Sequence, residues 1–507
     1  MKFSRLTLAV AAFLGTGAAS TAHAIDLYVD VKTKQIYAEP GPHRQLMGAF
    51  ERVEDKPAVA PADTAEIAAV HKDLEMKTNE INALKEHMAE AEKVKVKMDK
   101  KGLQVESADN AFKFKLGGRI HADSQFSSGD DYLDKSRPPL HVEANDGTEI
   151  RRARMRFEGV FYNDWLFRTE ADFADDNVRV KDAFIEYLGL KDYVVITAGQ
   201  QKQNFSRELQ ESSNDMMFTE RSLMNILNNP TVDRAIGLNF QSFGKTYTAK
   251  LGIYGDSITP ARTGTTPEVK NAGDEGWGIS SRLVYNPIIE KTKLIHLGIA
   301  GNYRIPDDTG DVAKANQLRY QYETNNMSNL DLVDARVFDV DNIAMLGLEA
   351  AGLYGPFSVG AEYTRSWIDR QKKGTIIENG DSNLELDGWY VDAAWSITGE
   401  SRGYKSGSFG YLEPDKPFSL KNGGWGAWEL AARYSSADLN DGSFLGGELS
   451  NVTVALNWYI NSNFRILANY TRLLDIENSP LTTSTSATLT GNNADLNTYM
   501  LRAQVAY

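Results

Sequence analysis

The chain has 507 residues, of which 42% are hydrophobic, and its formal net charge is −14. This acidic balance argues against nucleic acid as a partner, because a phosphate backbone attracts basic surfaces. The sequence has no cysteine, which excludes disulfides and thiolate metal sites.

The amino terminus has the three parts of a secretory signal peptide. Lys2 and Arg5 form a basic segment, and residues 6–14 (LTLAVAAFL) form an apolar one. The triplet Ala-His-Ala at 22–24 is typical of a cleavage site, so we predict that residues 1–24 are removed and that the mature chain begins at Ile25. The apolar run is shorter than the roughly 20 residues of a transmembrane helix, which disfavours a membrane anchor.

The next regions differ in period. Residues 25–62 are interpreted as a short periplasmic module that ends in a linker. Residues 63–93 begin with a capping-box sequence, which predicts the start of a helix. Residues 94–110 are interpreted as a basic and then polar connector.

Within 63–93, apolar residues recur at alternating spacings of three and four, which is the seam of a coiled coil. We therefore expect a self-associating α-helical coiled coil in the periplasm. The alternative is a single amphipathic helix packed on the rest of the chain. The seam consists of Ile67, Val70, Leu74, Ile81, Leu84, Met88 and Ala91, with one polar position at Lys77.

From Ala111 to Tyr507 the pattern has a period of two. Sixteen segments of about ten residues each have one apolar, aromatic-rich face and one polar or small face, and short and long connections alternate between them. An even number of such segments after an export signal is typical of an outer-membrane β-barrel. We therefore predict an all-β membrane protein, with a 16-stranded antiparallel transmembrane β-barrel over residues 111–507, in the outer membrane of a Gram-negative cell.

The alternation also predicts which side chains face the lumen. An arginine or lysine on the lipid face costs about 2–4 kcal/mol, so the charged positions of the first two and last two strands should point inward. These strands are neighbours in a closed barrel, and their inward cations form a predicted basic wall: Lys113, Lys115, Arg119, Arg152, Arg154, Arg156, Arg465 and Arg502.

Acidic residues leave a second interpretation of the lumen open. Glu349, Glu362, Asp392 and Glu429 fall on predicted inward positions of other strands, and Glu170 and Asp172 lie beside the basic wall. In this second interpretation the inward charges neutralise one another and the wall has no role in selecting ions.

Residues 204–229 separate the fifth and sixth predicted strands, and they are polar and partly helical in pattern. Irregular backbone at membrane depth is stable only where protein or pore water satisfies its polar groups. We interpret this stretch as an inward-folded constriction loop that narrows the channel. Its charged and hydroxyl residues are Arg207, Glu208, Glu211, Ser212, Ser213, Asp215, Glu220 and Arg221.

Several segments, in order along the chain, resemble the phosphate-selective porin O and P family of Gram-negative bacteria. They are FKLGGRIHAD, RRARMRFEG, VKDAFIEY, FSRELQESSNDMMFTERSLMN, SITGESRGY and GAWELAARY, and the resemblance covers residues 111–507. It implies a homotrimer of sixteen-stranded barrels, each with its own pore for passive diffusion of anions such as phosphate. It further implies functional positions at Arg152, Asp182, Ser212, Ser213, Glu220 and Arg221.

The chain also departs from the family pattern. Leu209 stands where phosphate-specific members have a lysine, and the long loop around Arg319 lacks the family's run of arginines. At two other constriction positions, Arg154 and Lys202, this chain has a more basic residue than the family pattern leads us to expect. This suggests that positive charge has moved from the loop to the wall. Lys202 therefore joins the predicted anion-binding residues.

Fixed cations in a narrow pore concentrate anions and repel cations. We therefore predict a channel for phosphate or related oxyanions, without cofactor or metal. No Ser-His-Asp set falls on strand positions, so no enzyme activity is expected. The alternative is a general small-solute porin with weak ion selectivity, in which Glu208, Glu211 and Asp215 create a transverse field.

The expected partners are other copies of the chain, outer-membrane lipid, lipopolysaccharide and the permeating anions. A peptidoglycan contact through the amino-terminal helix would add a structural role in the envelope.

Overall fold

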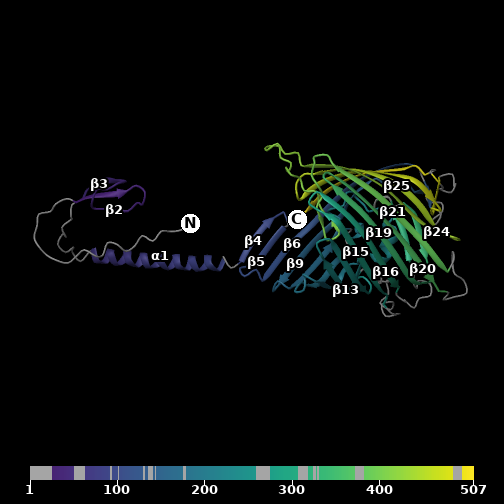
Figure 1. The fold of residues 1–507 in the computed structure, drawn as a ribbon, viewed down its shortest axis with the longest axis horizontal. Coiled ribbons are helices and arrows are strands. Elements are labelled where there is room, and N and C mark those ends of the chain that lie inside the picture. The colour runs from purple at the N-terminus through teal and green to yellow at the C-terminus, as the bar shows by residue number, and fades with distance from the viewer. Residues whose placement is uncertain are drawn as a thin grey trace, which may run out of the picture. The chain divides into compact units, whose positions relative to one another are not determined.

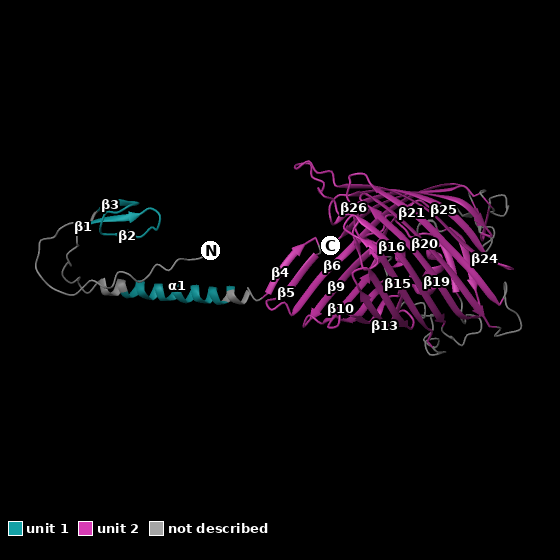
Figure 2. Ribbon diagram, in the orientation of Figure 1, with its two compact units in different colours: residues 1–89 teal, residues 90–507 magenta. Residues whose placement is uncertain are grey.

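The computed structural model describes residues 25–50, 63–91, 94–100, 102–129, 132–134, 141–142, 144–174, 178–258, 275–306, 318–323, 327, 330–371, 382–483, 491 and 494–507. The chain divides into two compact units, residues 1–89 and 90–507 (Figure 2). The predicted signal peptide at 1–24 and the predicted linker around 56–61 lie outside the described residues.

The first unit contains a small sheet and a long helix. Strands β1 (Ile25–Asp30), β2 (Ile36–Tyr37) and β3 (Arg44–Phe50) form an antiparallel sheet in the order β2-β1-β3. Helix α1 spans Asp63–Ala91. None of the helices in the described ranges is long and apolar enough to cross a membrane. Five residues of the heptad seam are more than half exposed in the single chain: Val70, Leu74, Ile81, Leu84 and Met88.

The second unit is a closed antiparallel barrel, with sixteen wall strands in the part of the chain that the structure describes (Figure 1). Each wall strand pairs with the next, and the last pairs with the first, as the sequence predicts. The strands are β6 (Phe112–Gly129), β9 (Gly147–Phe161), β10 (Trp165–Asp172), β11 (Arg179–Tyr187), β12 (Val195–Lys202), β13 (Arg234–Phe243), β14 (Tyr247–Tyr254), β15 (Trp277–Ile289), β16 (Lys293–Ile305), β19 (Val340–Tyr354), β20 (Phe357–Arg370), β21 (Asn383–Ser396), β24 (Ala427–Asp441), β25 (Phe444–Tyr459), β26 (Phe464–Glu477) and β28 (Leu496–Ala506).

The outer surface of the barrel is apolar and has aromatic residues at two levels. One level lies beside the tight turns, and the other lies farther along the same strands. Two belts of amphipathic rings are typical of the two interfaces of a bilayer. The first level includes the pairs Phe357–Trp395 and Trp428–Trp458, and the second includes Trp389–Tyr434 and Tyr470–Tyr499.

Residues 94–110 are not the connector that the sequence analysis predicts. They form a hairpin of β4 (Val94–Asp99) and β5 (Gly102–Ser107), and β5 pairs with the start of β6, where Leu103 is opposite Leu116. Strand β28 pairs with the later part of the same edge of β6. The valine–lysine alternation of VKVKMD is strand-like, but its charge masked this signal. The hairpin supplies hydrogen-bond partners to the part of β6 that β28 does not reach.

Long connections fold into the barrel from both ends. At one end are the hairpin of β17 (Leu318–Glu323) and β18 (Asp331–Val337) and the small sheet of β7 (Tyr132–Asp134), β8 (His141–Val142) and β27 (Leu481–Thr483). At the other end, β22 (Tyr404–Lys405) and β23 (Ser408–Phe409) belong to the connection between β21 and β24. Apolar residues of the first group pack inside the wall, among them Leu318, Val333 and Leu481.

Candidate pore constriction

The connection between β12 and β13 is the predicted inward loop. It contains α2 (Arg207–Gln210) and α3 (Asn225–Val232). Phe205, Leu209, Leu223 and Leu227 are at most 1% exposed and pack with residues of the barrel wall. The apolar side chains of this segment therefore fix it inside the barrel.

Basic residues hold this loop by its backbone carbonyl groups. The Lys202 ammonium donates to the carbonyl oxygens of Leu209 (2.6 Å), Gln210 (3.4 Å) and Glu211 (3.0 Å). Such charge-assisted hydrogen bonds are roughly twice as strong as neutral ones. Five arginines make similar bonds: Arg465 to Met216 (2.9 Å), Arg502 to Thr219 (2.6 Å), Arg402 to Asp215 (3.1 Å), Arg433 to Glu220 (3.1 Å) and Arg221 to Glu208 (3.2 Å).

Three residues predicted to bind anions, Lys202, Arg465 and Arg502, are thus engaged with the loop. Sequence reasoning missed this role because the carbonyl partners lie on a segment whose path only the fold defines. The Lys202 ammonium lies beside the backbone of Leu209, the position where the resemblance implies a lysine. The Leu209 side chain itself is 1% exposed and belongs to the apolar core.

Several other residues of the predicted basic wall contact carboxylates. Arg119 lies 3.0 Å from Glu170 and donates to the Ser213 hydroxyl (2.9 Å), and Arg154 lies 2.7 Å from Asp172. Arg502 donates two hydrogen bonds to Asp123, and Arg152 lies 3.6 Å from Glu220. Arg156 and Lys115 lie 3.9 and 3.8 Å from Glu158. The wall is therefore partly neutralised, as the second interpretation of the lumen requires.

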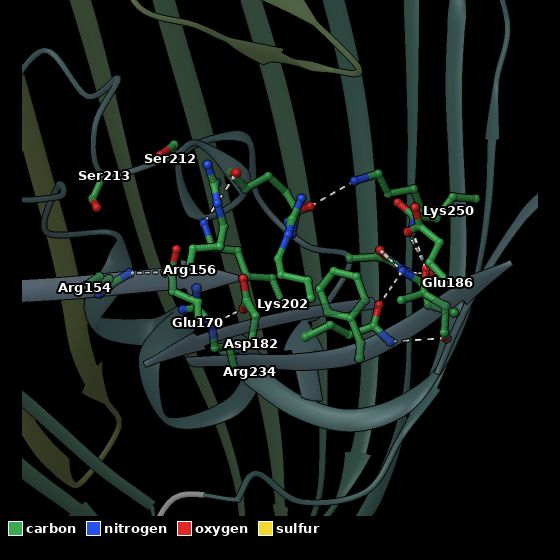
Figure 3. Close-up of a pocket in the computed structure, with 18 of the residues that line it drawn as sticks. Arg154, Arg156, Glu170, Asp182, Glu186, Lys202, Ser212, Ser213, Arg234 and Lys250 are labelled. Atoms are coloured by element: carbon green, nitrogen blue, oxygen red, sulfur yellow. Dashed lines mark hydrogen bonds and ion pairs between the residues drawn. The ribbon is translucent and has the colours of Figure 1, made fainter. Parts of the chain in front are cut away.

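The solvent-accessible space is nevertheless strongly basic. A cavity of about 330 Å³ lies between the loop and strands β6 and β9 to β14, and it is lined by nine arginines and lysines but only three acids, Glu170, Asp182 and Glu186. Ser212 and Ser213 line it from the loop. Figure 3 shows the labelled basic residues spread from Arg154 on one side to Lys250 on the other. The nine are Arg119, Arg152, Arg154, Arg156, Arg168, Lys202, Arg221, Arg234 and Lys250.

Two further cavities continue this space toward the long connections. One shares Arg152, Arg154, Arg221 and Arg234 with the first cavity. The remaining cavity shares Arg151, Arg221 and Asn229 with the cavity just described, and it is bordered by Gln321 and Tyr322 of β17. Arg221 lines all three cavities, so it is a residue that they have in common. Lys113 and Lys115, although predicted as pore residues, line none of the three.

The inward acids of the opposite wall are paired with arginines. Glu349 accepts two hydrogen bonds of 2.7 Å from Arg282, and Glu429 accepts two from Arg402 (2.8 and 2.7 Å). Arg207 lies 3.7 Å from Glu362 and 3.5 Å from Asp392. None of these four acids lines the three cavities. Glu208, Glu211 and Asp215 of the loop do not line them either.

Three carboxyl groups of the loop have shifted pKa values, and burial raises the pKa of one of them, Asp215. Burial raises the pKa of Glu211 to about 7, although Arg207 lies 3.6 Å away and opposes the shift. Burial acts in the same direction on Glu220, but Arg151, Arg152 and Arg502 hold its pKa well below the usual range. Glu220 is therefore ionised at neutral pH, whereas Glu211 is only partly ionised.

Sequence reasoning missed Arg168, Arg234 and Lys250 of the cavity lining. Lys250 occupies an inward position of TYTAKLGIY, where Tyr247 and Leu251 face outward and are exposed. The alternation rule, applied to this strand as it was to the first two, would have found it. Lys250 donates to the Gln210 side chain of the loop (3.0 Å), and Arg234 lies 2.9 Å from Asp182.

A sixteen-stranded barrel with a folded loop across its lumen defines the chain as an outer-membrane porin. The chain belongs to the phosphate-selective porin O and P family, whose sequence model matches residues 114–507. Porin O of Pseudomonas aeruginosa is 26% identical over 401 residues, which cover 74% of this chain and 85% of the relative. An uncharacterized protein of Caulobacter vibrioides is 29% identical over 380 residues, which cover 74% and 70%.

Solved structures include similar barrels. The anion-selective porin from Comamonas acidovorans aligns with a TM-score of 0.45 and 10% identity, covering 78% of this chain and 100% of that one. The outer membrane channel DcaP of Acinetobacter baumannii aligns with a TM-score of 0.44 and 13% identity, covering 79% and 99%.

Proposed function

We propose that this porin conducts small oxyanions, inorganic phosphate among them, by passive diffusion through a cation-lined constriction. One observation carries the proposal: the cavity beside the constriction loop is lined by nine basic residues against three acids, while the acids of the opposite wall are paired with arginines and do not line it. Fixed cations beside a narrow aqueous path concentrate anions and exclude cations.

The lining suits an oxyanion better than a simple halide. Arginine offers two parallel N–H donors to such a group, and the hydroxyls of Ser212 and Ser213 add neutral donors. Because the cations are spread along three connected cavities, an anion meets several weak sites in succession. Conduction requires this arrangement, since one tight site would retain the ion.

The alternative is a general porin with a transverse field, which needs the loop acids in the path. Glu208, Glu211 and Asp215 lie outside the three cavities. The loop acid Glu220 does line the second cavity, but it is paired there with Arg151 (2.9 Å), and this favours the anion channel.

We further propose a homotrimer in contact with outer-membrane lipid and lipopolysaccharide. The exposed heptad seam of α1 supports self-association. A contact between α1 and peptidoglycan is part of the same proposal.

The test is the reversal potential of the purified protein in a planar bilayer under a tenfold KCl gradient, repeated with added phosphate. Strong anion selectivity with phosphate block would support the proposal. Weak or cation selectivity without block would support the general porin.

A further inference from the structure

Glu362 of β20 lies where the constriction loop leaves the wall, and it is 4% exposed. One carboxylate oxygen accepts from the Ser206 hydroxyl (2.7 Å) and the Arg207 backbone N–H (2.8 Å). The other accepts from the Glu208 backbone N–H (2.7 Å) and the Tyr390 hydroxyl (2.5 Å). Three of the four donors belong to the loop, so this one side chain holds the loop's first turn.

Glu208 extends this connection across the loop. Its own carboxylate accepts from the backbone N–H (2.9 Å) and the hydroxyl (2.7 Å) of Ser222, and from Arg433 of β24 (3.2 Å). The stretch between Glu208 and Ser222 carries Arg221 and the serine pair that line the path. Two buried carboxylates therefore tie both ends of the pore-lining stretch to the wall.

We propose that Glu362 and Glu208 are positioning residues that set the aperture of the channel. Neither lines the path, so they act through the loop and not by touching the permeating ion. Glutamine at position 362 keeps the size of the side chain but has one acceptor oxygen in place of two. Two of the four donors then lose their partner, and the first turn of the loop is released. The proposal rests on the channel function proposed above but not on its anion preference.

The experiment is liposome swelling with uncharged sugars of increasing size, using the full chain. Neutral solutes report the aperture whatever ions the channel prefers. For Glu362→Gln we expect the permeation rate of a disaccharide relative to a pentose to rise at least threefold. Glu208→Gln should act in the same direction, and Tyr390→Phe, which removes one of the four bonds, should act more weakly.

The matched control is Glu349→Gln. Glu349 is as buried as Glu362 and sits opposite it in the β19–β20 pairing, but its partners Arg282 and His296 belong to the wall. An unchanged sugar ratio in Glu362→Gln, or an equal rise in Glu349→Gln, would overturn the proposal. If Glu362→Gln does not fold, Glu362→Asp, which keeps the charge with a shorter reach, must still show a raised ratio. If the channel showed weak anion selectivity while Glu362→Gln still raised the disaccharide-to-pentose ratio, only the proposed function would be refuted.

Discussion

Replacement of Arg221 should change ion selection more than any other single substitution in the constriction. Arg221 lines all three cavities. A unit charge at roughly 5 Å from a permeating ion in water contributes about 0.8 kcal/mol, with opposite sign for an anion and a cation. Arg221→Gln should therefore lower the chloride-to-potassium permeability ratio by about tenfold, because the two contributions together exceed the 1.4 kcal/mol that corresponds to a factor of ten.

The assay is the reversal potential in a planar bilayer under a tenfold KCl gradient, at low and then at higher total salt. The difference between the variant and the original channel should shrink at higher salt, because mobile ions screen fixed charges. Arg221 also donates to the carbonyl groups of Glu208 and Glu211 (3.2 and 3.4 Å), so its removal loosens the loop as well. Arg221→Lys separates the two effects, since it keeps the charge but loses the fixed pair of donors.

The control is Arg319→Gln. Arg319 lies on β17, is paired with Asp334 (2.6 Å) and lines none of the three cavities. Its replacement should change the permeability ratio by less than about twofold, as expected for an exposed ion pair. The reasoning would be refuted if Arg221→Gln left the ratio unchanged or if Arg319→Gln changed it as much.

Three further predictions concern other parts of the chain. As the pH falls from 8 to 6, Glu211, whose pKa is about 7, takes up a proton and the lumen loses a negative charge, so anion preference should rise; the rise should be smaller in Glu211→Gln, and a rise of equal size in the variant would contradict the assignment. Leu209→Lys should destabilise the folded loop by roughly 2 kcal/mol or more, because it buries an ammonium among apolar side chains, and it should lower the temperature at which the barrel unfolds on a heat-modifiability gel without strengthening phosphate block. Ile81→Asp should lower the temperature at which the oligomer dissociates, whereas Glu80→Asp beside the seam should not; equal dissociation temperatures for the two variants would refute the coiled coil.

The barrel could be predicted from the sequence because one physical rule acts at every wall position. A charged side chain facing lipid is costly, so each spanning segment must alternate, and short turns must join neighbouring strands. The same local logic located the start of α1, since the capping box begins at Asp63, where the helix begins. The hairpin of β4 and β5 escaped this logic because its strands do not cross the membrane and carry lysine on an exposed strand.

The constriction was only partly predictable. Its residue types, and the inward course of the loop, follow from the polar and amphipathic pattern of 204–229. Whether the basic wall is neutralised depends on distances of a few ångströms between residues far apart in the chain. Arg119 meets Glu170, and Arg502 meets Asp123 from the other end of the barrel sequence.

The sequence by itself determined the number of strands, the face on which most charges of the wall lie and the identity of the loop that enters the lumen, while the export signal stays a prediction. These depend on periodicity and on the cost of charge in lipid, which act locally along the chain. Only the tertiary structure decided which cations remain beside the aqueous path and which hold the loop. Lys202 and Arg221 both line the first cavity and both donate to loop carbonyl groups, but the fold directs three hydrogen bonds of Lys202 to carbonyl groups and places Arg221 beside all three cavities.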